Sequence, residues 1–490
     1  MYMKFRNIIL SAISSVSLFA SCNFLEVEKL GKSDIESFFS DVYALESAVN
    51  GLYNLTYSFY DSYMILYPEV TGDMIEYSTT TTNMLEQYNF NSKETEETGP
   101  VGYIWRKGYE IILNANEIIE FGAPLLNEYP EQKNRINASF ARTYFIRALA
   151  LLDLSLCYAQ HYTYTADASH LGVAVMTYLP PVYSSISRSS VKDTYDRIIT
   201  DLNTAISLFP RGYSFNVDFA SPAACEALLA RVYLYMGQYE DAAKHADNVI
   251  RNYGLSLTPY KDYVKMFCSV DYPEKESIFR LNGFDLGTSL HANYDYNQPA
   301  MRPSQKLRDI FDEDAEEGMH DIRDSLTMYK DIEGIEYSNV CMKYSITYNL
   351  NNTAERLRHY DPIVLRLAEM YLIRAEANCA LNNLDDAADD IATLRERAYN
   401  LAEGSVTIDY TDASDLDAII ERERIKELFL EGHRLFDITR RKKNLERDPN
   451  TNSTVKEISY PDNRFILPIP LVELDANKSM QSNPINDTQQ

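Results

Sequence analysis

The chain has 490 residues, 45% of them hydrophobic and 24% charged, a composition that excludes a fibrous or intrinsically disordered chain. Lysine and arginine number 46 against 72 aspartates and glutamates, which gives a net charge of −26. An acidic surface of this kind repels phosphate backbones and argues against nucleic-acid binding. The 17 glycines are too few for the tight turns of sandwiches and propellers. Aromatic residues are dominated by 38 tyrosines, with a single tryptophan.

The first 21 residues have the features of an export signal. Two basic residues precede an apolar run, residues 8–20, that is too short to span a bilayer as a helix. The run ends in Leu18-Phe19-Ala20-Ser21 directly before Cys22, an order that resembles the lipobox of bacterial lipoproteins. We therefore expect residues 1–21 to be removed and Cys22 to carry lipid. An ordinary cleavage site with an incidental cysteine is the alternative.

The five cysteines after Cys22 do not form a recognisable framework. They are Cys157, Cys225, Cys268, Cys341 and Cys379. Their number is odd and no Cys-x-x-Cys spacing occurs, so buried free thiols are favoured over disulfides. No metal site of cysteine and histidine is predicted.

Most of the chain shows the periodicity of paired helices. Apolar residues recur every three or four positions on both sides of Gly237, and small alanines line the faces where the two helices would meet. This pattern resembles a tetratricopeptide (TPR) repeat. The three predicted pairs are Ala223–Tyr253, Ile363–Tyr399 with Asn382 in the place of the glycine, and Arg135–Gln160 with Asp193–Pro210.

Long segments without a sustained period interrupt these helices. They are residues 60–103, 161–190, 254–305 and 331–360. All are rich in tyrosine and small polar residues or proline, and segments of this length are usually functional or disordered. Their aromatic content favours folded, functional loops on one side of a helical frame.

Charged residues are embedded in the apolar helix Leu365–Ala377. They are Arg366, Glu369, Arg374 and Glu376. Buried charges need partners, and the charged segment Glu421–Ile438 is the predicted supplier.

Within that segment, the carboxylates of Glu423, Glu427 and Glu431 suggest a glycosidase acid and base as one alternative. We reject it because each has an arginine within helical reach, and a neighbouring cation keeps a carboxylate ionised.

An acidic stretch, Asp312–Glu317, offers hard oxygens for calcium, but its spacing does not follow an EF-hand. A solvated acidic loop is the favoured interpretation, and Asp321 and Arg323 downstream are predicted to form a structural pair.

Several separated motifs together resemble the SusD/RagB family. They are the lipobox before Cys22, Trp105–Ile119, Tyr195–Leu202, Leu365–Ala377, Glu423–Asp437, and Arg464–Leu474 with Gln481–Pro484. The resemblance implies an all-α, SusD-like fold with TPR-type hairpins, as one domain over residues 22–490 with parts of about 22–320 and about 321–490. It also implies a surface-facing outer-membrane lipoprotein of Bacteroidota that captures glycans, or in some members peptides, for a SusC-type TonB-dependent transporter.

The candidate binding site is built on tyrosine, because the only tryptophan, Trp105, lies in a helical motif and is predicted to be core. Aromatic faces stack on sugar rings while carboxylates, amides and arginine bond the hydroxyls. Two insertions interleave these types, at 73–77 with 87–89 and at 291–302. The predicted ligand-binding residues are Asp73, Tyr77, Tyr88, Tyr294, Tyr296 and Arg302. The alternative is that these tyrosines pack the loops onto the helices.

The sequence therefore predicts a binding protein without catalytic activity, since no nucleophile–base pair, metal cluster or phosphate loop is visible. It needs no cofactor or metal. Its predicted ligand is an oligosaccharide, its partner a SusC-like transporter, and its location the outer membrane through an N-terminal lipid. A peptide-binding member and a TPR-type envelope scaffold are the alternatives.

Overall fold

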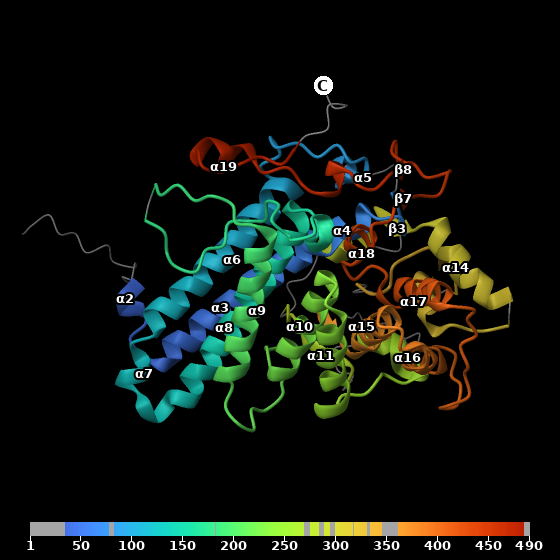
Figure 1. The fold of residues 1–490 in the computed structure, drawn as a ribbon, viewed down its shortest axis with the longest axis horizontal. Helices are drawn as coiled ribbons and strands as arrows, with labels where there is room; N and C mark the ends of the chain where they lie inside the picture. Colours follow the sequence, from blue (N-terminus) through green and yellow to red (C-terminus); the bar gives the residue numbers. More distant parts are fainter. Residues whose placement is uncertain are drawn as a thin grey trace, which may run out of the picture.

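Long helices run side by side across the molecule, and short strands join some of the irregular segments (Figure 1). The computed structural model describes residues 35–77, 83–181, 183–268, 275–283, 289–294, 299–316, 318–330, 334–344 and 361–484. The α-helices are α2 (Ile35–Phe38), α3 (Val42–Phe59), α4 (Leu66–Val70), α5 (Leu85–Tyr88), α6 (Pro100–Gly122), α7 (Leu125–Glu128), α8 (Lys133–Tyr158), α9 (Val191–Leu208), α10 (Pro222–Met236), α11 (Tyr239–Asn252), α12 (Tyr263–Cys268), α13 (Ser289–Tyr294), α14 (Gln305–Glu316), α15 (Leu367–Ala380), α16 (Leu384–Ala398), α17 (Ala413–Leu428), α18 (Arg434–Arg440) and α19 (Leu471–Ala476). The predicted all-α class is confirmed.

The strands are short and pair two by two, always antiparallel. Their bounds are β1 (Ile75–Tyr77), β2 (Ser277–Arg280), β3 (Met301–Pro303), β4 (Met328–Lys330), β5 (Glu336–Ser338), β6 (Ile363–Arg366), β7 (Leu445–Glu446) and β8 (Glu457–Ile458), paired as β1–β3, β2–β6, β4–β5 and β7–β8. The β1–β3 and β2–β6 ribbons join segments that are far apart in the chain, whereas β4–β5 and β7–β8 are local hairpins. Each sheet among the described residues has two strands.

The three predicted helix pairs are confirmed. Helices α10 and α11 are joined at Gly237, whose φ of 70° is the left-handed conformation that ends a helix sharply. Asn382 takes the same conformation, with φ of 64°, between α15 and α16. Helices α8 and α9 pack along each other although residues 159–190 separate them in the chain. Close packing also depends on Gly108, where an added Cβ would lie 2.7 Å from the Leu154 side chain of α8.

The cysteine prediction is confirmed where the structure describes the side chains. Cys157, Cys225, Cys341 and Cys379 are buried free thiols. Cys22 lies outside the described residues.

Two predictions about irregular segments are wrong in part. Segment 60–103 contains a π-helical turn, Tyr60–Met64, together with α4, β1 and α5, because its apolar residues pack onto the core. Segment 254–305 contains β2 and α13.

The acidic stretch is not a loop, because residues 312–316 form the last turns of α14, where Asp314 is buried and pairs with Lys426 at 2.7 Å. The predicted pair of Asp321 and Arg323 is confirmed at 2.6 Å.

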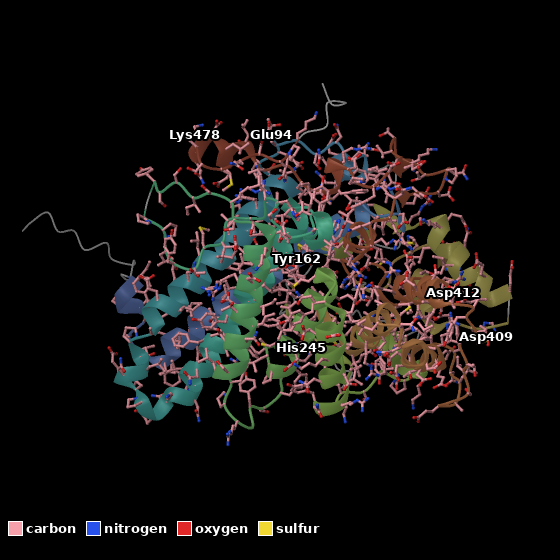
Figure 2. The ribbon with its side chains drawn as sticks, in the orientation of Figure 1. Glu94, Tyr162, His245, Asp409, Asp412 and Lys478 are labelled. Carbon is pink, nitrogen blue, oxygen red and sulfur yellow. The ribbon has the colours of Figure 1, made fainter. Side chains whose placement is uncertain are left out.

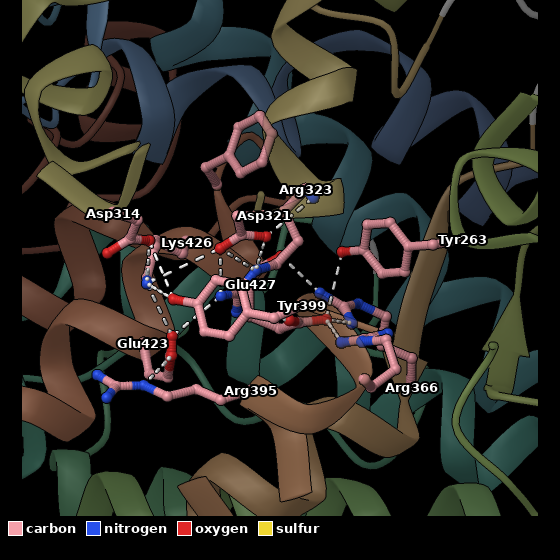
Figure 3. A network of polar contacts seen from close by, with 12 residues as sticks. Tyr263, Asp314, Asp321, Arg323, Arg366, Arg395, Tyr399, Glu423, Lys426 and Glu427 are labelled. Carbon is pink, nitrogen blue, oxygen red and sulfur yellow. Dashed lines mark hydrogen bonds and ion pairs between the residues drawn. The ribbon is translucent and has the colours of Figure 1, made fainter. Parts of the chain in front are cut away.

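A buried network of arginines and carboxylates joins distant segments (Figure 3). Arg366, 1% exposed, places its guanidinium 2.6 Å from Glu427 and 3.0 Å from Glu276. Arg323, fully buried, contacts Glu423 at 3.0 Å and Glu427 at 3.1 Å. The network therefore connects the segment before β2, η5 (Ile322–Thr327), β6 and α17.

These carboxylates stay ionised. Burial by itself raises the pKa of Glu427, but Arg397, Arg366 and Arg323 outweigh it and hold that pKa well below its ordinary value. The pKa of Glu423 is likewise lowered, because Arg323 and Lys426 outweigh the effect of burial. Neither carboxyl can store the proton that a glycosidase acid donates, which supports rejecting that alternative.

The expected partners of the α15 charges are confirmed for Arg366, which reaches Glu427 and also Glu431 at 2.8 Å. The expectation is wrong for two others. Glu369 pairs with Arg231 of α10, and Arg374 pairs with Asp390 of α16. The reason is that α15 lies between α10, α11 and α16, so its faces meet different helices.

The Glu376 carboxylate forms ion pairs with both Arg440 and Arg441, at 2.6 Å and 2.9 Å. These two arginines lie just beyond the segment Glu421–Ile438 that was the predicted supplier.

Removing one charge from the network tests its structural role. Arg366→Met should lower the free energy of unfolding by about 3–5 kcal/mol, because the carboxylates of Glu276, Glu427 and Glu431 would stay buried without the positive charge of the guanidinium. Arg251→Met, which removes an exposed ion pair with Asp247, should change it by less than about 0.5 kcal/mol. Urea denaturation measures both. Equal effects would contradict the role of the network.

Candidate functional site

The two insertions predicted to bind ligand meet at the β1–β3 ribbon. Glu76 lies opposite Arg302, and Tyr77 lies opposite Met301. Nearby, the Asn83 side-chain amide donates to the Asn293 side chain at 2.7 Å. Segments more than 200 residues apart in the chain are therefore held together at one place, as the hypothesis of a joint site requires.

A hollow of about 210 Å³ lies beside this ribbon. It is lined by Asp73, Ile75, Glu76, Ser304, Gln305, Arg447, Asp448, Asn450 and Thr451. Carboxylate, amide and hydroxyl groups dominate the lining, which suits a ligand rich in hydroxyls. We call this feature the ribbon hollow.

Asp73 anchors the floor of the ribbon hollow. Its carboxylate pairs with Arg434 at 2.6 Å and with Lys306 at 2.8 Å. Burial alone raises the pKa of Asp73, but Arg434 and Lys306 outweigh it and hold the pKa below its ordinary value. Both carboxylate oxygens are engaged, so Asp73 positions Arg434 and Lys306.

Tyr77 and Tyr88 form a buried stack under the site. Their ring centroids are 5.3 Å apart with an interplanar angle of 27°, and their exposures are 2% and 0%. The Arg447 guanidinium lies 4.4 Å from the Tyr88 ring centroid and donates to the carbonyl oxygens of Val70 and Gly72. The stack therefore fastens the segment after β7 to the segment before β1.

Tyr294 is also buried, at 2% exposure, and stacks on Tyr344 with centroids 5.9 Å apart. Its hydroxyl has no hydrogen-bond partner among the residues that the structure describes. Tyr296 lies outside the described residues. Of the predicted set, Arg302 is the exposed one, at 45% of its side chain, and its Nε lies 3.3 Å from Glu76. Stacking of a ligand on these tyrosines stays a prediction, because the three described rings pack inside the fold.

Sequence reasoning missed the segment that closes the ribbon hollow, residues 447–452. The Asn452 amide donates to the Tyr77 carbonyl at 2.9 Å, and the hydroxyls of Thr451 and Tyr88 are hydrogen-bonded. A signal was present, since Asp448, Asn450 and Thr451 form a polar turn between β7 and β8. Only the fold shows that this turn meets a segment 375 residues earlier.

A second and larger hollow, about 1030 Å³, runs along α6 between residues 174–186 and α19. We call it the α6 groove. Trp105 borders it but is 5% exposed and packs on Tyr109 and Tyr158, which confirms the prediction that it belongs to the core.

Other types of site are absent from the part of the chain that the structure describes. No group of three or more histidine, cysteine, aspartate or glutamate side chains there is arranged to hold a metal ion. Within the same residues, no helix combines the length and the apolar character needed to cross a bilayer.

Comparison with known proteins agrees with the motifs and the fold. A family model described as "SusD family" matches residues 322–485, and one described as "Starch-binding associating with outer membrane" matches residues 23–234. These matches confirm the resemblance to the SusD/RagB family. One relative, "SusD-like protein P2" of Formosa agariphila, is 28% identical over 94% of this chain and 96% of its own length.

Solved structures of SusD superfamily proteins share the fold. A protein from Bacteroides thetaiotaomicron VPI-5482 matches with a TM-score of 0.77 and 22% identity, over 91% of this chain and 100% of its own. A protein from Bacteroides vulgatus ATCC 8482 matches with a TM-score of 0.76 and 26% identity, over 91% and 99%. Another from that organism, described as a putative sugar binding protein, has a TM-score of 0.77 and 24% identity, over 91% and 98%.

The burial of Tyr294 leads to a test that separates stability from binding. Tyr294→Ala should lower the free energy of unfolding by about 3–5 kcal/mol, because it leaves a cavity against Tyr344. Tyr294→Phe should leave it unchanged or raise it by up to about 1 kcal/mol, because the hydroxyl has no partner to lose. Denaturant titration of both variants measures this. A Phe variant as unstable as the Ala variant would show that the hydroxyl is bonded.

Proposed function

We propose that this SusD/RagB protein is a lipid-anchored outer-membrane protein that binds an oligosaccharide and delivers it to a SusC-type TonB-dependent transporter. The family model described as "Starch-binding associating with outer membrane" supports the ligand class and the membrane association, and the solved neighbour described as a putative sugar binding protein supports the ligand class. It acts by binding, without catalysis. The buried, ionised carboxylates of α17 hold the fold together.

The observation that carries this proposal is the meeting of β1, β3 and residues 447–452 around the ribbon hollow. Glu76 and Arg302 present a carboxylate and a guanidinium within 3.3 Å of each other at its edge. In the proposed complex the carboxylate accepts a hydrogen bond from one sugar hydroxyl and the guanidinium donates to an adjacent one. Asn450 adds an amide to the lining.

Aromatic contact would come from the segments that continue from this ribbon. Tyr296, between α13 and β3, is the predicted platform there, and the buried Tyr77–Tyr88 stack supports the polar rim from below. Affinity must be moderate, because a ligand held too tightly is not passed on. A shallow polar hollow on a rigid helical frame meets that requirement.

A peptide ligand is the second candidate within the same family. The Glu76–Arg302 pair favours it in one respect, since opposite charges 3.3 Å apart also match the charged groups of a peptide. An oligosaccharide remains the main proposal because Ser304, Gln305, Asn450 and Thr451 supply neutral polar groups to the lining, and the Asp73 carboxylate is already paired.

Direct titration tests the ligand and the site together. A glycan array screened with the purified protein should identify an oligosaccharide, and Arg302→Ala should weaken its binding by about tenfold in calorimetry, the loss of a charged hydrogen-bond donor. Arg211→Ala, which removes an exposed arginine elsewhere, is the matched control and should leave affinity unchanged. Binding of peptide pools with no glycan response would favour the peptide ligand. Equal affinity in the Arg302 variant would remove the ribbon hollow as the site.

Anchoring by lipid is tested at Cys22. Cells grown with labelled palmitate should incorporate it into the wild-type protein, while Cys22→Ser should abolish incorporation and release the protein from the outer-membrane fraction, because the acylated thiol is gone. Cys379→Ser is the control, since that thiol is largely buried at the end of α15. Label retained in the Cys22 variant would show that the lipid is attached elsewhere, and a wild-type protein without label would show that it is not lipidated.

A further inference from the structure

The α6 groove is the larger of the two hollows described above, and one helical face forms its floor. Gly102, Trp105, Tyr109, Leu113 and Glu117 line it at spacings of three and four residues. Fifteen residues of helix span about 22 Å, so the groove is long and straight.

The opposite wall is fixed to the rest of the fold. The Asn477 amide donates to the Ile186 carbonyl at 2.8 Å, and the Ser185 hydroxyl donates to Asn477 at 2.9 Å. At the start of α19 the Leu471 amide donates to the Glu94 carbonyl at 2.7 Å. Glu94 and Lys478 lie along the same edge of the molecule (Figure 2). The groove is therefore a built feature between two anchored walls.

Several large apolar side chains at this groove are exposed to solvent. Tyr183 is fully exposed, and Val472 is 52% exposed. Leu471 and Tyr178, next to the lining residues, are 37% and 56% exposed. Apolar groups gathered around a hollow mark surfaces that another molecule covers, and tyrosine and methionine are favoured where the partner is a protein. Met176 and Met480 belong to the same lining.

The polar groups of the lining are mainly acidic. Four glutamates, Glu97, Glu110, Glu117 and Glu473, stand against one arginine, Arg106. Glu110 is paired with Lys107 and Glu473 accepts from Trp105. Among the described residues, neither a cation nor a hydrogen-bond donor holds the carboxylates of Glu97 and Glu117. A bound molecule that carries positive charge would supply ion-pair partners for these two carboxylates.

The two aromatic residues on the α6 floor are largely covered, whereas the exposed Tyr183 belongs to the wall formed by residues 174–186. Trp105 and Tyr109 are 5% and 9% exposed, and their rings pack on each other with centroids 4.7 Å apart. Little of either ring is open for stacking on a sugar. The lining as a whole combines apolar side chains, such as Leu113, Met176 and Val472, with charged ones, and such a mixture resembles the grooves that receive amphipathic helices.

We infer that the α6 groove docks a basic, amphipathic helical segment of a second polypeptide. Its apolar side chains would lie on Leu113, Met176 and Val472, and its lysines or arginines would reach Glu97 and Glu117. This inference does not rest on the proposed function, because the α6 groove and the ribbon hollow share no lining residue.

The test uses a defined probe and matched variants of the full protein. The probe is a fluorescent 15-residue amphipathic helix of leucine and lysine, and its glutamate counterpart is the charge control. Glu97→Lys with Glu117→Lys should weaken binding of the lysine probe by about tenfold, because two attractions become repulsions. Glu120→Lys with Glu128→Lys makes the same charge change at exposed positions outside the groove and should alter affinity less than twofold.

The Val472→Asp variant distinguishes a helix docked in the groove from a probe that is held only by the negative charge of the protein. It adds negative charge, which would strengthen a purely electrostatic association, but it removes an apolar contact and should weaken a docked helix. The inference is overturned if the control pair weakens binding as much as the groove pair, or if Val472→Asp strengthens it. Displacement of the probe by maltoheptaose would also overturn it, by assigning the groove to carbohydrate.

Discussion

The fold depends on compensating buried charge. Arg366, the last residue of β6, pairs with Glu276 from before β2, with Glu427 near the end of α17 and with Glu431 just beyond that helix. Each of these ions would be costly to bury alone, and each is tolerated because several partners surround it. The network therefore makes segments that are distant in the chain stable only in each other's presence. It fixes the helical pairs that carry the irregular segments.

The segment that follows α17 connects the buried network to the ribbon hollow. Glu427 belongs to the network, and a few residues later the backbone amides of Leu430, Gly432 and His433 donate to the carboxylate of Glu69. Burial raises the pKa of Glu69 to about 7 although these amides lower it. The next residue, Arg434, pairs with Asp73 under the ribbon hollow. Network and site thus share one continuous segment, so the ribbon is held by a frame that does not need ligand to form.

Much of this could be predicted from local pattern. Alanine spacing with Gly237 and Asn382 identified the helix pairs, and the isolated charge of Arg366 required carboxylate partners. Polar and aromatic interleaving also identified the two segments that meet at the ribbon. The burial of Tyr77, Tyr88 and Tyr294 could not be predicted, because tyrosine serves equally as a ligand platform and as core, and the choice depends on contacts made hundreds of residues away. Arg447 was missed for the same reason: its acceptors are the carbonyls of Val70 and Gly72.

Hydrogen exchange with and without a saturating oligosaccharide tests the central claim most directly. A site on a preformed frame predicts slower exchange of amides in residues 72–77, 301–305 and 447–452, with α17 (Ala413–Leu428) equally protected in both states. Protection that spreads through α17 would show that ligand completes the frame. Protection confined to other surfaces, with the ribbon segments unchanged, would show that the ribbon hollow is not where the sugar binds.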